Sequence, residues 1–114
     1  MQLERHDYDE AILITVNESR IDAAVAIQFK DRLRNLAGDG PARVVLDVAK
    51  VEFLDSSGLG AVVAAMKQLG THRKLELAGL TPTVEKVFRL TRMDTVFTIH
   101  KDAGAAVDGL AHAS

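Results

Sequence analysis

The sequence "VVLDVAKVEFLDSSGLGAVVAAMKQ", residues 44–68, passes from an apolar strand pattern through a polar corner into a helical pattern. Residues Arg43–Val48 are mostly valine and leucine, which is typical of a strand covered on both faces. A short extended connection or bulge is expected over residues 49–54. Over about Ser57–Leu69 the apolar residues return at helical spacing, and Gly70 ends that pattern. The stretch therefore predicts one strand–corner–helix unit.

The rest of the chain repeats this alternation of strand and helix. Asp22 is suited to cap a helix that follows it in the sequence. In that helix one apolar stripe is formed by Val25, Phe29, Leu33 and Leu36. Other strands are expected over residues 3–6, 11–16, 74–80 and 95–100, a turn over 7–10, and other helices from Thr81-Pro82 and over 103–111. The predicted fold class is α/β. We expect one domain, residues 1–114, with a four- to five-stranded, mostly parallel mixed sheet, an antiparallel edge and about four helices.

Length and composition restrict the class of protein. A chain of 114 residues suits one domain, and 47% hydrophobic with 26% charged residues is typical of a folded soluble protein. The sequence has no cysteine, which excludes disulfides and thiolate metal sites. A net charge of −2 argues against a general nucleic-acid surface, and no apolar run approaches the ~20 residues of a membrane helix. We therefore expect a cytoplasmic protein that binds neither nucleic acid nor membrane and holds no cofactor or metal.

Three interpretations of the corner, residues 55–58, follow from its chemistry alone. Aspartate and serine are good N-cap residues, so the corner can serve only as a helix cap. A catalytic serine is disfavoured, because neither serine fits the G-x-S-x-G pattern and the four histidines are scattered along the chain. Asp47 and Asp55 could act as paired carboxylates that hold Mg²⁺ or carry phosphate. This interpretation is weak, because the first strand ends in Val16-Asn17-Glu18 and supplies no acidic pair.

A fourth interpretation is that a partner phosphorylates one of the serines. Phosphate adds a charge of roughly −1.5 to −2, and a helix N-terminus favours an anion through its dipole and its free N–H groups. The fold would tolerate this modification. A protein docked on the corner would instead meet a bulky dianion in place of a neutral hydroxyl. The chemistry thus predicts a switch that acts on binding rather than on folding.

The stretch 44–68 closely resembles the core of the STAS-domain family, specifically the bacterial anti-sigma factor antagonists. The resemblance extends to "RIDAAVAIQF" (20–29), "LELAGLTPTVEKVF" (75–88) and "MDTVFTIHKD" (93–102). It implies a partner-switching protein that is not an enzyme. In that family an anti-sigma factor, itself an ATP-dependent serine kinase, phosphorylates the serine after the aspartate, which corresponds to Ser56, with Ser57 as its neighbour and cap. The unphosphorylated form binds the kinase and releases a sigma factor, and a serine phosphatase restores that form.

The resemblance and the small residues of the helix together predict a contact surface for the partner. We expect the partner to cover Asp22 with its loop and the corner with the first one or two helical turns. The predicted contact residues are Asp22, Asp55, Ser56, Ser57, Gly58, Leu59 and Ala61. Small residues usually mark close packing, but those turned outward would let a partner approach closely. On this basis Ala61→Arg is expected to weaken binding while the domain stays folded.

Two positions depart from the pattern of the family. The loop over residues 18–22 has no glycine, and Arg92 stands where glycine is common. An alternative function is a STAS component of a lipid or solute transporter, or a stressosome-type scaffold. A nucleotide-binding enzyme is disfavoured, because the chain has no G-x-x-x-x-G-K-[ST] loop. Weak nucleotide association and a homodimer stay open.

Overall fold

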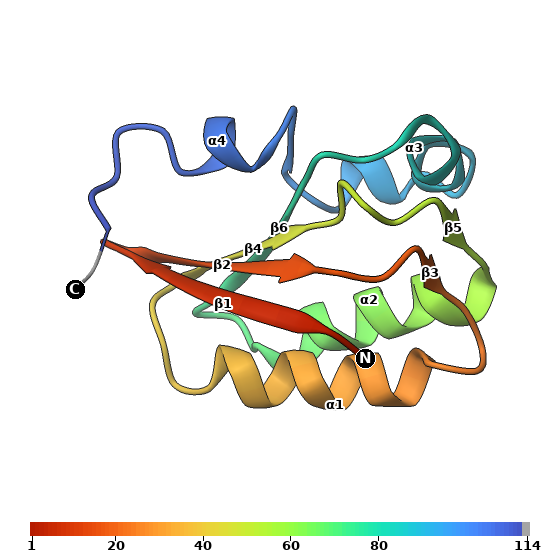
Figure 1. The fold of residues 1–114 in the computed structure, drawn as a ribbon, viewed down its shortest axis with the longest axis horizontal. Helices are drawn as coiled ribbons and strands as arrows, with labels where there is room; N and C mark the ends of the chain where they lie inside the picture. Colours follow the sequence, from red (N-terminus) through yellow and green to blue (C-terminus); the bar gives the residue numbers. More distant parts are fainter. Residues whose placement is uncertain (113–114) are drawn as a thin grey trace.

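A computed structural model describes residues 1–112 and contains a five-stranded mixed sheet (Figure 1). The strand order is β1-β2-β4-β6-β7, in which only the β1–β2 pair is antiparallel. These strands are β1 (Leu3–Tyr8), β2 (Ala11–Val16), β4 (Arg43–Asp47), β6 (Lys74–Ala78) and β7 (Ile99–His100). The helices are α1 (Ala26–Ala37), α2 (Ser56–Gln68), α3 (Pro82–Leu90) and α4 (Ala103–Ala106), with a 3₁₀ turn, η1 (Met93–Thr95). The predicted α/β class and the antiparallel edge are confirmed.

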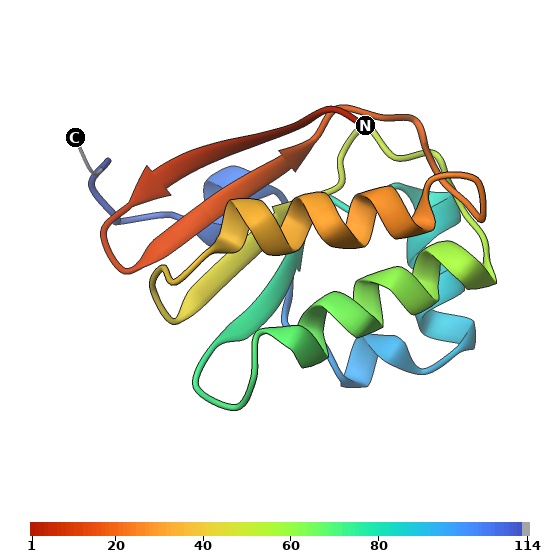
Figure 2. The same cartoon turned by 90° about the horizontal axis from the view of Figure 1, so that it is seen from below.

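The helices form unequal layers on the two faces of the sheet. The helices α1 and α2 lie side by side on one face, as both views show, and pack against each other (Figure 2). The short helix α4 lies on the opposite face (Figure 1). The helix α3 packs beside η1 and the short strand β5 (Phe53–Leu54). The α1–α2 side therefore supplies most of the buried volume.

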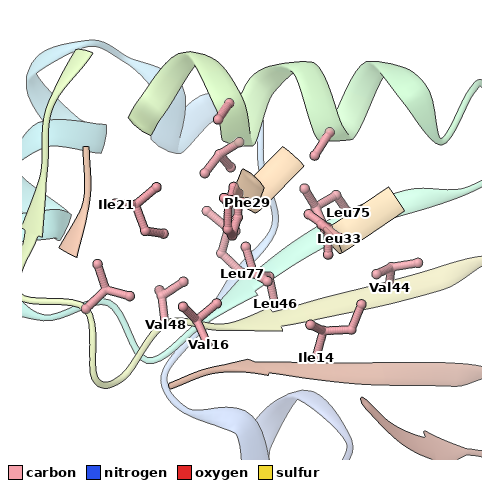
Figure 3. Close-up of a cluster of buried hydrophobic side chains, with 14 of the residues drawn as sticks. Ile14, Val16, Ile21, Phe29, Leu33, Val44, Leu46, Val48, Leu75 and Leu77 are labelled. Carbon is pink, nitrogen blue, oxygen red and sulfur yellow. The ribbon is translucent and has the colours of Figure 1, made fainter. Parts of the chain in front are cut away.

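Alternation along the central strands divides their side chains between two clusters. Alternate residues such as Ile14, Leu46 and Leu77 meet Phe29 and Leu33 of α1 in the main core (Figure 3). The intervening positions Leu13, Val45 and Ala78 form a smaller cluster with Ala106 of α4. Covering both faces explains why these strands read as nearly continuous apolar runs.

A buried ionic network lies under α4. Glu76 is 5% exposed, and its carboxylate accepts hydrogen bonds from the Arg43 guanidinium at 2.7 and 2.8 Å. His100 Nε2 lies 2.7 Å from the same carboxylate, and Arg43 also donates to the carbonyl of Ala106. The hydrogen bonds from Arg43, with a smaller contribution from His100, lower the pKa of Glu76. The network ties β4, β6 and β7 to α4.

The structure differs from the sequence prediction at several element ends. The strand β1 extends to Tyr8, because residues 7 and 8 pair with Ile12 and Ala11 across a two-residue turn. The last strand, expected over 95–100, is reduced to Ile99–His100. Its first half is displaced because Phe97 turns into the core, with its ring centroid 5.8 Å from that of Phe88. The terminal helix, expected over 103–111, ends at Ala106.

The predicted cap of α1 is wrong. Asp22 Oδ1 accepts a hydrogen bond from the N–H of Ala24 at 3.1 Å, so it stabilises the turn before the helix. The helix itself begins at Ala26 after Val25, which contributes no side-chain cap. The intervening turn is needed because residues Arg20–Ile21 form an additional short strand, β3, which pairs in parallel with β5. This pairing was not predicted, since a two-residue strand has no detectable period.

Candidate functional site

The corner is built on Asp55, which caps α2. Its backbone is extended, and its Oδ1 accepts a hydrogen bond from the N–H of Gly58 at 2.8 Å. The helix starts at Ser56, one residue earlier than predicted. The prediction that Ser57 acts as the cap is therefore wrong, because the carboxylate of Asp55 already satisfies an N–H group of the first turn.

The second oxygen of Asp55 joins the corner to the loop before α1. Asp55 Oδ2 accepts a hydrogen bond from the N–H of Ala23 at 3.2 Å. Arg20 Nε lies 3.2 Å from Asp22 Oδ2, and the Arg20 guanidinium stacks 4.2 Å above the Phe53 ring centroid. The short β3–β5 pairing holds these segments in register. Asp22 and Asp55 thus lie on one rim, as expected.

Gly58 lies where α2 comes closest to β3. A Cβ atom at Gly58 would lie 2.0 Å from the carbonyl oxygen of Ile21 and 2.8 Å from Leu54 Cδ1. Such distances are impossible without movement of the backbone. Gly58 therefore shapes the corner and presents no surface to a partner.

Ala61 is also buried, which corrects its predicted place on the contact surface. It is 7% exposed and belongs to the main core with Val62 and Ala65. An arginine at this position would disturb the packing of α2, so Ala61→Arg cannot separate binding from folding. Gly60 is the small residue that faces outward, and a Cβ atom there would meet nothing within 4 Å.

The two serines occupy the first two positions of α2 and open onto different grooves. Both are exposed, and neither hydroxyl takes part in a hydrogen bond among residues 1–112. A groove of about 400 Å³, here called the Ser56 groove, is lined by Ser56, Leu59, Gly60, Val63, Ala64, Lys67, Thr91 and Met93. A groove of about 190 Å³, here called the Ser57 groove, is lined by Ala26, Ile27, Lys30, Ser57, Gly60, Ala61 and Ala64. Successive helical residues point about 100° apart, which explains the separation.

The Ser56 groove contains residues that the sequence did not single out as contacts. Thr91 and Met93 come from the α3–η1 connection and lie opposite α2. Arg92 between them has φ +60° and ψ +19°, a left-handed conformation that glycine adopts readily. The signal of this special geometry came from the family resemblance, since Arg92 stands where glycine is common in relatives.

The neighbours of the serines do not resemble a catalytic centre. No histidine or carboxylate lines the Ser56 groove. Among the described residues, His100 binds Glu76 and His112 stacks on Tyr8 at a centroid distance of 4.4 Å. Asp47 Oδ1 accepts a hydrogen bond from the N–H of Ala49 at 3.0 Å, which gives this carboxylate a structural role after β4. Within residues 1–112 no group of three or more histidine and acidic side chains could hold a metal ion.

Comparison with known proteins places this geometry in a family. Residues 2–106 match the family model of the STAS domain. The chain belongs to the STAS-domain family. BtrV of Bordetella bronchiseptica, named as an anti-sigma factor antagonist, is 30% identical over 101 residues, which cover 88% of this chain and 87% of BtrV.

Solved STAS structures share the fold over nearly their whole length. An anti-sigma factor antagonist from Mycobacterium paratuberculosis is 25% identical with a TM-score of 0.81, covering 92% of this chain and 89% of that one. Unphosphorylated SpoIIAA, an anti-sigma factor antagonist, has a TM-score of 0.74 at 21% identity over 94% of each chain. A phosphorylated form of SpoIIAA from Bacillus has also been solved. Within residues 1–112 of the STAS domain described here, no helix is both long enough and apolar enough to cross a bilayer.

Proposed function

We propose that this STAS protein is an anti-sigma factor antagonist controlled by phosphorylation of Ser56. Its unphosphorylated form binds an anti-sigma factor that is also a serine kinase, and this binding releases a sigma factor. The kinase transfers phosphate from ATP to Ser56, and it binds the phosphorylated protein only weakly. A serine phosphatase then restores the binding form. The protein acts as ligand and substrate, with no chemistry of its own.

The observation that carries this proposal is the position of Ser56 directly after the Asp55 cap. Its hydroxyl is exposed at the first residue of α2 and is not used by the fold. The positive end of the helix would accept a phosphate at low cost in folding free energy. The names of the relatives and the existence of a phosphorylated SpoIIAA support the same assignment.

Mass spectrometry after incubation with ATP and the cognate kinase tests the modification. We expect one phosphate on the peptide that contains Ser56. The variant Ser57→Ala should still be phosphorylated, whereas Ser56→Ala should not be phosphorylated and should still bind the kinase. Phosphate on Ser57 in the wild-type protein would contradict the assignment of Ser56.

The charge-mimicking variant Ser56→Asp tests the switch itself. We expect it to fold normally and to bind the kinase at least about tenfold more weakly than the wild type does. Undiminished binding would count against the switch and would favour the alternative functions, of which the STAS component of a transporter needs no phosphorylation. In that case the membrane or scaffold partner should co-purify with wild type and variant alike.

A further inference from the structure

The outward side of α2 offers two grooves, and only one of them is contiguous with Ser56. The Ser56 groove has about twice the volume of the Ser57 groove, at about 400 Å³ against about 190 Å³. Gly60 and Ala64 form the low ridge between them, because both residues line both grooves. A partner that binds beside Ser56 therefore finds the larger groove on the α2–η1 side of this ridge.

We propose that the Ser56 groove is the anchoring site for the anti-sigma factor, which inserts an apolar side chain there and pairs a carboxylate with Lys67. This inference rests on the proposed function and specifies which flank of α2 the partner occupies. The Ser57 groove, between α1 and α2, then lies at the margin of the contact.

The lining of the Ser56 groove fits an apolar anchor. Leu59, Val63 and Met93 are half-buried and present hydrocarbon or thioether surface, and methionine adapts readily to the shape of an incoming group. The hydroxyl of Thr91 is already used within α3, because it donates to the carbonyl of Val87 at 2.7 Å. Gly60 leaves open space above the helix. Desolvated apolar pockets of this kind receive the residues that dominate binding energy in many protein interfaces.

The polar groups of the groove lie at its two ends. Ser56 begins α2, and Lys67 follows eleven residues later, so the two positions are about 16 Å apart along the helix axis. Lys67 is exposed and forms no ion pair within the described part of the chain. A partner with an apolar anchor and a carboxylate toward the Lys67 end would match both the shape and the charge of this surface.

The same arrangement explains how phosphate stops binding without a change of fold. A phosphate on Ser56 would place about two negative charges at the mouth of an apolar groove. An inserted apolar side chain would then strip water from the dianion, which is unfavourable without compensating donors. The neighbouring carboxylate of Asp55 would offer no compensation, because it is itself negatively charged and only accepts hydrogen bonds.

Two matched pairs of variants distinguish the grooves. Met93→Gln and Lys67→Glu change the Ser56 groove, and Ile27→Gln and Lys30→Glu make the same changes in the Ser57 groove. Binding of each unphosphorylated variant to the cognate kinase is measured by calorimetry, with thermal unfolding as the check on folding. We expect the first pair to weaken binding at least about tenfold and the second pair to stay within about twofold of wild type.

The outcomes separate this inference from the proposed function. Weaker binding only for the Ser57-groove pair, equal weakening for both pairs, or no weakening for either would overturn the anchoring site. Each of those results is compatible with a wild-type protein that binds the kinase and releases it on phosphorylation. If the wild type neither binds the kinase nor accepts phosphate, the proposed function fails first. If Met93→Gln proves less stable than wild type, Lys67→Glu still tests the groove, because the Lys67 side chain is exposed and its substitution should not disturb packing.

Discussion

Gly58 is the residue at which the corner, residues 55–58, tolerates no side chain. The predicted Cβ position, 2.0 Å from the Ile21 carbonyl oxygen, requires the backbone of α2 or β3 to move. We expect Gly58→Ala to lower the free energy of unfolding by about 2–4 kcal/mol. Gly60→Ala is the matched control and should raise it by up to about 1 kcal/mol, because its Cβ meets nothing and alanine favours the helix. Urea titrations that show the two variants equally stable would contradict this packing.

Arg92 carries a backbone conformation that suits glycine. With φ at +60°, it pays a conformational penalty of about 1 kcal/mol that glycine does not. We expect Arg92→Gly to stabilise the domain by about 0.5–1 kcal/mol in thermal unfolding. Lys86→Gly, in the regular part of α3, should instead destabilise it by about 1 kcal/mol. A destabilised Arg92→Gly would mean that the arginine side chain contributes more than its conformation costs.

The individual roles in the corner were only partly predictable from the sequence. The residue types Asp, Ser and Gly indicated a helix start, and Ser56 was distinguished from Ser57 only by family resemblance. The sequence did not show that Asp55 alone caps α2 or that Ala61 is buried in the core. Both facts depend on the rotation of α2 about its axis. A shift of one residue in the helix start changes that rotation by about 100°.

The attachment of α4 to the sheet depends on the Arg43–Glu76–His100 network. Loss of the Glu76 charge would leave the Arg43 guanidinium without its main partner in a partly buried place. We expect Glu76→Gln to destabilise the domain at pH 7 by about 2–3 kcal/mol. The exposed pair Glu85–Arg89 supplies the control, because its atoms are 3.5 Å apart and Glu85→Gln should change stability by less than about 0.5 kcal/mol. Equal effects of the two substitutions would argue against a structural role for the network.

The same network predicts the acid limb of the stability curve. The folded-state pKa of Glu76 is lowered below its ordinary value of 4.5, so its contribution is fully present above that pH. The contribution is lost as the pH falls through the folded-state pKa, where the carboxylate takes up a proton. Chemical denaturation between pH 7 and pH 3 should therefore show a shallower acid loss in Glu76→Gln than in wild type. A parallel curve for the variant would contradict this assignment.

Elements whose apolar pattern extends over many residues were predicted well, and very short elements were not. The strands at residues 11–16 and 43–47 and the helix α2 matched the prediction to within about one residue at each end, and α3 begins where it was predicted to begin. The pair β3–β5 was missed and β7 was overextended, because two-residue pairings are decided by tertiary contacts such as that between Phe97 and Phe88. The prediction made α4 too long because the alanines of this segment favour a helix. In the structure Gly109, at φ +80°, belongs to a turn.

At the scale of the whole molecule, the main core lies apart from the exposed Ser56. That core lies between the sheet and the α1–α2 layer, while Ser56 is the exposed first residue of α2. The fold class and the family could be read from the sequence, since both rest on patterns spread over nearly the whole chain. The Ser56 groove could not, because it joins α2 to a segment more than twenty residues away in the sequence.

Control of binding by Ser56 is tested most directly by the affinity of the kinase for the protein before and after phosphorylation of this residue. The measurement is calorimetric titration of the cognate anti-sigma factor with wild-type protein, first unmodified and then carrying one phosphate confirmed at Ser56. We predict specific binding of the unmodified form and a loss of affinity of about 100-fold or more on phosphorylation, with an unchanged circular dichroism spectrum. Equal affinities for the two forms would contradict the central claim that phosphate on Ser56 controls binding.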